Sequence, residues 1–153
     1  MRARDGHEAR VTNSELFFDL ICAFAVTQLS HHLLGDLTLT GAVQTLILWI
    51  TVWLGWQYTV WVTNWFDPDA MPIRIMLPCV MIVGLLMSAV LPEAFGERGL
   101  IFAICYVGIQ IGRTVFVLMM LGRGNALTAN VRRIHGWMLI ISISWIWGAF
   151  AHE

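Results

Sequence analysis

Long apolar stretches separated by short polar breaks dominate the hydropathy pattern of this chain. Each stretch is close to the roughly 20 residues that an α-helix needs to cross a bilayer core about 30 Å thick. The pattern therefore predicts an all-α, polytopic transmembrane helix bundle of about five spans. The predicted spans cover residues 15–34, 40–64, 72–92, 99–121 and 131–151.

The breaks between the predicted spans carry turn-forming residues. Residues 35–38 and 67–69 combine aspartate with glycine or proline, and residues 92–99 begin with Pro-Glu. The fourth break, residues 122–130, is the longest and the most polar. Because no soluble segment or clear repeat interrupts this order, we expect a single transmembrane helical domain over residues 1–153.

Composition supports a membrane protein and argues against nucleic-acid binding. The chain is 58% hydrophobic and 12% charged, with a mean hydropathy of +0.72, which leaves too little polar surface to cover a soluble globule. Its net charge is −1, and a basic surface for nucleic acid is not expected. The expected partners are membrane lipid, other helices and an unknown small solute.

Arginines are distributed unevenly between alternate breaks. Positively charged flanks remain on the cytoplasmic side of a membrane, so we predict a cytoplasmic N-terminus, with Arg98 as the only flanking arginine outside. The arginines on the cytoplasmic side would be Arg2, Arg4, Arg10, Arg74, Arg123, Arg132 and Arg133.

Two opposite charges fall inside predicted spans: Asp19 in the first and Arg113 in the fourth. A charged side chain at the centre of a span costs on the order of 2.5–3.5 kcal/mol, so each normally faces a partner or an aqueous cavity. We predict that Asp19 and Arg113 form an ion pair if their spans are neighbours. Such a pair can line a solute or proton pathway; the alternative is a structural lock that only fixes helix packing.

Other polar residues of the same two spans extend this predicted polar core. Gln28 lies in the first span and Gln110 in the fourth, where both can line a pathway. Glu15 lies four residues before Asp19 and therefore on the same helix face. Glu15 also completes the pattern Thr12-Asn-Ser-Glu15 of a capping box, so capping of the first helix is its alternative role.

Titratable residues also gather near the predicted external surface. His31 and His32 end the first span, at a depth similar to that of Glu93, and such a group can relay protons. The alternative is hydrogen bonding with interfacial water and headgroups. Adjacent histidines point about 100° apart on a helix and are poor co-ligands, so neither a metal nor a cofactor is expected. Without a Ser–His, Cys–His or metal-ligand constellation, we do not expect an enzyme.

Two further patterns concern helix packing. Gly108 and Gly112 form a GxxxG motif on a different side of the fourth span from Arg113, and such a motif allows another helix to approach closely. Trp49, Trp53 and Trp56 form a stripe at helical spacing in the middle of the second span. We interpret the stripe as packed core, with a platform for a cation or ligand as the alternative.

Several motifs together resemble the low temperature requirement A family of bacterial membrane proteins. They lie at residues 15–20, 24–32, 58–69, 92–99 and 112–116. This resemblance implies a polytopic protein of the bacterial inner membrane, typically more than twice as long as this chain, with no well-established biochemical activity. The chain would then be the N-terminal half of such a bundle. We expect it to form a homo-oligomer or to depend on the missing C-terminal half.

Overall fold

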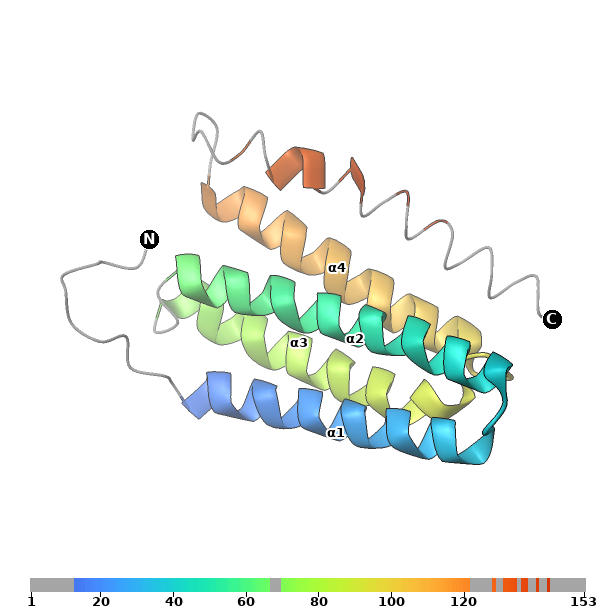
Figure 1. Ribbon diagram of the computed structural model, residues 1–153. Helices are drawn as coiled ribbons and strands as arrows, with labels where there is room; N and C mark the ends of the chain where they lie inside the picture. The colour runs from blue at the N-terminus through green and yellow to red at the C-terminus, as the bar shows by residue number, and fades with distance from the viewer. Residues whose placement is uncertain are drawn as a thin grey trace.

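The computed structural model describes residues 13–66, 70–121, 128, 131–134, 136, 137, 140 and 143 of the 153-residue chain. In this part of the chain, four long helices run side by side and alternate in direction (Figure 1). They are α1 (Asn13–Gly35), α2 (Leu39–Trp65), α3 (Met71–Val90) and α4 (Gly99–Leu121), with the short 3-10 helix η1 (Leu91–Glu93) after α3. The predicted all-helical fold is confirmed for these residues.

The helix boundaries follow local turn chemistry. Thr38 is the N-cap of α2, and its side-chain oxygen accepts a hydrogen bond from the Gly41 N–H at 3.1 Å. α3 begins beside Pro72, because proline suits the first turn of a helix, where its missing N–H would have no partner. Pro92 similarly lies in the first turn of η1, which directly follows the end of α3 at Val90.

Three threonine hydroxyls inside α2 donate hydrogen bonds within the helix. The hydroxyls of Thr45, Thr51 and Thr59 each donate to the carbonyl four residues earlier, at 2.8, 2.8 and 2.9 Å. Serine and threonine hydroxyls commonly make this local bond, so they need no acceptor on another helix. An otherwise apolar helix can therefore carry them within a membrane.

Viewed along their axes, the four described helices lie at the corners of a square. α1 contacts α2 and α3, and α4 contacts the same two helices, so α1 and α4 lie at opposite corners. The core between them is apolar, and Leu48, Ile73 and Phe102 in it are fully buried. This corner arrangement decides which charged residues can meet.

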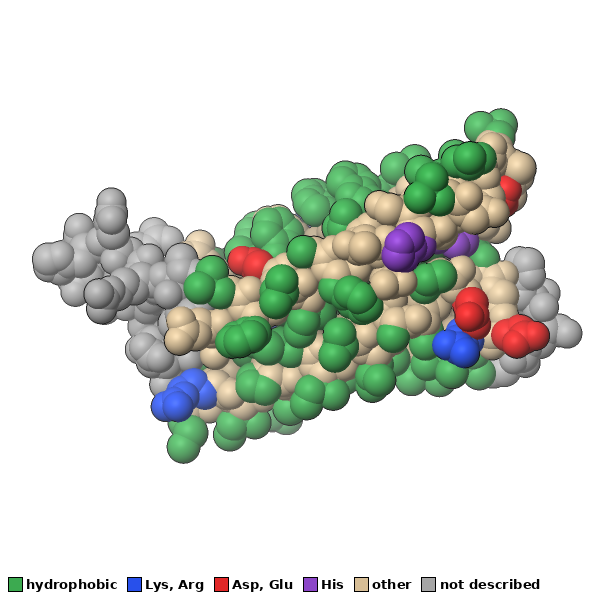
Figure 2. All heavy atoms as spheres, turned by 90° about the horizontal axis from the view of Figure 1, so that it is seen from below, with side chains coloured by type: hydrophobic (Ala, Val, Ile, Leu, Met, Phe, Trp, Pro, Cys, Tyr) green, Lys and Arg blue, Asp and Glu red, His purple; other side chains and the backbone are tan. Residues whose placement is uncertain are grey.

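The outward surface of the described bundle is also apolar. Large side chains such as Leu16, Leu39 and Met119 are 56%, 84% and 76% exposed. Figure 2 shows hydrophobic side chains along the whole length of one face, with charged side chains gathered mainly toward its ends. Helices with apolar surfaces on both their inner and outer sides are typical of membrane bundles.

Four helices of the described residues are long and apolar enough to cross a membrane. They correspond to the first four predicted spans, the third of which ends in η1. The fifth predicted span, residues 131–151, lies largely outside the described residues. The number of spans and the side of the membrane on which the N-terminus lies therefore stay predictions.

Candidate functional site

A buried cation is the centre of the candidate site. Arg113 on α4 is only 3% exposed and faces α2. Its Nη1 donates to the Gly55 carbonyl at 2.9 Å and to Thr59 Oγ1 at 2.8 Å, and its Nη2 donates to Gln110 Oε1. The guanidinium carbon lies 5.4 Å from the centroid of the Tyr58 ring. We name these five residues the Arg113 network; every partner of the cation in it is neutral.

Gln110 positions the guanidinium from the same helix. It is 1% exposed and lies three residues before Arg113, on the same face of α4. Its Nε2 donates to the Tyr106 hydroxyl at 2.9 Å, which turns Oε1 toward the arginine. The Thr114 hydroxyl donates to the Gln110 backbone carbonyl at 2.7 Å. Gln110 is thus held from both its side chain and its backbone.

Asp19 has a different partner from the one predicted. It is exposed on α1, and its Oδ1 accepts a hydrogen bond from the Trp56 indole at 2.8 Å. The predicted ion pair with Arg113 is wrong, because α1 and α4 lie at opposite corners of the bundle. The acid instead binds the Trp56 side chain and the base binds the backbone carbonyl of Gly55, so the two charges contact successive residues of α2 from different neighbouring helices.

Neither of the other predicted core residues of α1 belongs to the Arg113 network. Glu15 is half-buried in the first turn of α1, while Thr12, its predicted capping partner, lies outside the described residues. Gln28 is half-buried further along α1 and is not a member of the Arg113 network. The single polar core that the sequence predicted is thus divided: Asp19 contacts α2 from α1, whereas Gln110 and Arg113 belong to the network on α4.

The predicted relay residues near η1 have separate surroundings. His31 is exposed, whereas the His32 Nδ1–H donates to the Pro92 carbonyl at 3.0 Å. The His32 Nε2 is buried without a hydrogen-bond partner among the described residues. Glu93 forms an ion pair with Arg98 at 2.9 Å, and both side chains are half exposed. A proton relay through these residues stays a prediction.

Several hollows of the described bundle adjoin the Arg113 network, among them one of about 40 Å³ lined by Tyr58 and Arg113. A central cavity of about 30 Å³ lies between all four helices, with Gly55, Trp56 and Thr59 in its lining, and this is room for about one water molecule. A groove of about 570 Å³ lies between α3 and α4. We name it the α3–α4 groove; its lining includes Ile75, Cys79, Val83, Gly108, Gly112 and Arg113.

The GxxxG glycines face open space in the α3–α4 groove. Within the described part of the chain, no atom of another element lies within 4 Å of a Cβ built on Gly108 or Gly112. A Cβ on Gly41 would instead collide with the backbone carbonyl of Asp36. The contact of the GxxxG motif with another helix therefore stays a prediction.

We expect alanine to be tolerated at Gly108 and not at Gly41. Gly108→Ala should leave the free energy of unfolding unchanged or raise it by up to about 1 kcal/mol, the helix propensity gained. Gly41→Ala should lower it, because the Asp36 carbonyl must move. Unfolding in detergent, followed by circular dichroism, measures both. A marked loss for Gly108→Ala would show that a helix outside the described residues packs on this motif.

Sequence reasoning missed the α2 side of the site. Tyr58, Thr59 and Gly55 supply most contacts of Arg113, and the available signal was a glycine and a threonine four residues apart on a span otherwise rich in aromatic residues. The tryptophan stripe was assigned to packed core, but Trp49 and Trp53 are 46% and 45% exposed. That assignment is wrong for these two residues, because helical spacing fixes a shared face and not what covers it.

Comparisons with known proteins match this chain to a family. Residues 10–153 match the family described as bacterial low temperature requirement A protein (LtrA). The chain is 35% identical over 152 residues to an uncharacterized protein of Rhizobium meliloti (strain 1021), and the match covers 99% of this chain and 37% of that relative. No solved structure matches it significantly. The predicted resemblance is therefore confirmed, and this multi-pass membrane chain belongs to the bacterial low temperature requirement A family.

Proposed function

We propose that this chain is part of a membrane transport unit in which Arg113 binds a small organic anion in the α3–α4 groove. The observation that carries the proposal is a guanidinium 3% exposed whose described partners are all neutral. A charge in the membrane interior is costly and marks substrate or ion pathways by default. An anionic solute would supply the missing counter-charge.

The donor inventory of the guanidinium supports this proposal. Arginine has five N–H donors, and the described residues accept three hydrogen bonds from Arg113. Two donors remain for a carboxylate, the group that the arginine fork binds best. The groove of about 570 Å³ has the size of a small-molecule site, whereas the central cavity of about 30 Å³ does not.

The alternative function is a structural module in which Arg113 only locks α4 to α2. The bonds from Arg113 to the Gly55 carbonyl and Thr59 favour this alternative, because they join two helices. A lock and a binding site differ in what an external anion does. Only a binding site responds to an added carboxylate.

The topology belongs to the same proposal. The excess of arginines in alternate breaks supports a cytoplasmic N-terminus in the bacterial inner membrane. The unpaired α3–α4 groove supports either a homo-oligomer or further helices of a longer chain as its outer wall. This chain spans 37% of the length of its Rhizobium meliloti relative. A longer family member therefore has additional sequence that can supply such helices.

Benzoate, an apolar ring with one carboxylate, is the probe that tests the anion site. Cys79 lines the groove and is exposed, so its alkylation by N-ethylmaleimide reports occupancy in a purified chain whose Cys22 and Cys105 are replaced by serine. We expect benzoate to slow alkylation and uncharged benzyl alcohol to leave it unchanged.

Two arginine variants give the matched control. Arg113→Met should abolish protection by benzoate, whereas Arg74→Gln should retain it, because Arg74 is exposed at the start of α3 and does not line the groove. Equal protection in the wild-type chain and in Arg113→Met would contradict the proposal. Absence of protection in every variant would favour the structural lock.

A further inference from the structure

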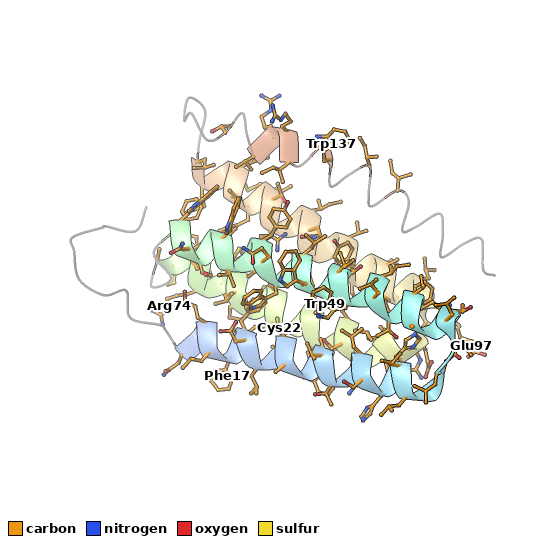
Figure 3. The ribbon with its side chains drawn as sticks, viewed as in Figure 1. Phe17, Cys22, Trp49, Arg74, Glu97 and Trp137 are labelled. Carbon is orange, nitrogen blue, oxygen red and sulfur yellow. The ribbon has the colours of Figure 1, made fainter. Side chains whose placement is uncertain are left out.

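A second groove carries an acid against an aromatic wall. It has a volume of about 280 Å³ and lies between α1 and α2. We name it the Asp19 groove; its lining includes Asp19, Cys22, Val26, Trp49, Trp53 and Trp56. Cys22 and Trp49, both labelled in Figure 3, belong to its α1 and α2 walls. Nothing in the proposed anion site uses this groove.

The aromatic wall is ordered by stacking and by the acid. The Trp49 and Trp53 rings stack with centroids 6.2 Å apart and an interplanar angle of 11°. Trp56 continues the same face of α2 and donates its indole N–H to Asp19 Oδ1 at 2.8 Å. The three indoles thus form one surface, with a carboxylate fixed at its edge.

Within the described helices, the Asp19 carboxylate has no cationic partner. Among the described residues its one hydrogen bond comes from Trp56, and no basic side chain pairs with it. Its neighbours Phe17, Leu20 and Phe24 are exposed apolar side chains, 62%, 63% and 38% exposed. An acid on an apolar face of a membrane helix is costly without a positive partner.

We propose that the Asp19 groove binds an amphiphilic organic cation, a quaternary or protonated amine with an apolar body. The carboxylate pairs with the positive charge, and the indole faces attract a cation electrostatically, tryptophan most strongly of the aromatic side chains. The apolar remainder of the ligand contacts Val26 and the groove walls. A bare metal ion fits poorly, because one carboxylate supplies too few oxygen ligands.

Benzyltrimethylammonium tests this site, with neopentylbenzene as its uncharged isostere. The full chain is placed in lipid nanodiscs, and binding is measured by equilibrium dialysis against empty nanodiscs. We expect saturable binding of the cation and only unsaturable partitioning of the isostere. The bound cation should also slow alkylation of Cys22, which lines the groove.

Three variants assign the binding to Asp19. Asp19→Asn keeps an acceptor for the Trp56 indole but removes the charge, so affinity should fall about tenfold or more. Asp19→Glu should retain binding. Glu97→Gln is the control, because Glu97 lies at the opposite end of the bundle from Phe17, a neighbour of Asp19 on α1 (Figure 3), and does not line the groove. It should leave affinity unchanged.

Several results would overturn the proposal. Equal binding by the wild-type chain and Asp19→Asn would reduce the groove to an apolar surface, and saturable binding of neopentylbenzene would do the same. If Asp19→Asn fails to fold, the comparison of cation with isostere and the protection of Cys22 decide the matter. The benzoate experiment at Arg113 is scored separately, so either site can fail alone.

Discussion

Arg113→Met is expected to leave the bundle folded while lowering its free energy of unfolding by about 1–3 kcal/mol, the cost of one buried acceptor without a donor. Thr59 still donates to the Gly55 carbonyl at 2.9 Å, and Gln110 still donates to Tyr106. Only Gln110 Oε1 is left without the partner it has in the wild-type chain. The apolar methionine also avoids the cost of burying a charge.

A second substitution tests this explanation. Gln110→Leu in the Arg113→Met background removes the orphaned amide, so the double variant should regain most of the lost stability. Thr114 keeps its bond to the backbone carbonyl of residue 110, which does not depend on the side chain. A double-mutant cycle of unfolding in detergent, followed by circular dichroism, measures the coupling between the two positions.

The opposite outcome has an equally clear meaning. If Arg113→Met prevents folding altogether, the guanidinium contributes more to helix packing than its three hydrogen bonds suggest. The structural module would then explain the buried charge better than an anion site. If Arg113→Met folds and the protection by benzoate disappears, the cost of burying Arg113 is offset by binding.

The helices themselves were predictable, because hydropathy and turn chemistry act locally. The predicted span 15–34 became α1 over Asn13–Gly35, and the break at residues 35–38 contains the Thr38 cap that starts α2. Because the thickness of the bilayer sets the length of a span, each span is visible in the sequence as a run of apolar residues of that length. Fold class follows from such runs without any knowledge of which helices touch.

The neighbours of each helix were not predictable in this way. Asp19 and Arg113 were assigned to one polar core because their charges are complementary, but hydropathy carries no information about the corner that a helix occupies. The decisive residues are Gly55 and Trp56, adjacent on α2, which direct the base to one side and the acid to the other. The backbone carbonyl of Gly55 and the side chain of Trp56 would have had to be placed before either charge could be paired.

Phe102→Ala is expected to cost about 3–5 kcal/mol, because removing a buried aromatic ring leaves a cavity that the surrounding helices fill only in part. Phe102 is fully buried in α4, whereas Ile104, two residues away on the same helix, is 58% exposed. Ile104→Ala should therefore change the free energy of unfolding by less than about 1 kcal/mol, since a side chain facing lipid or detergent loses few protein contacts. Unfolding of both variants in the same detergent measures the difference. Similar costs for the two would mean that α4 is rotated from the orientation that buries Arg113, because all three residues depend on that one rotation.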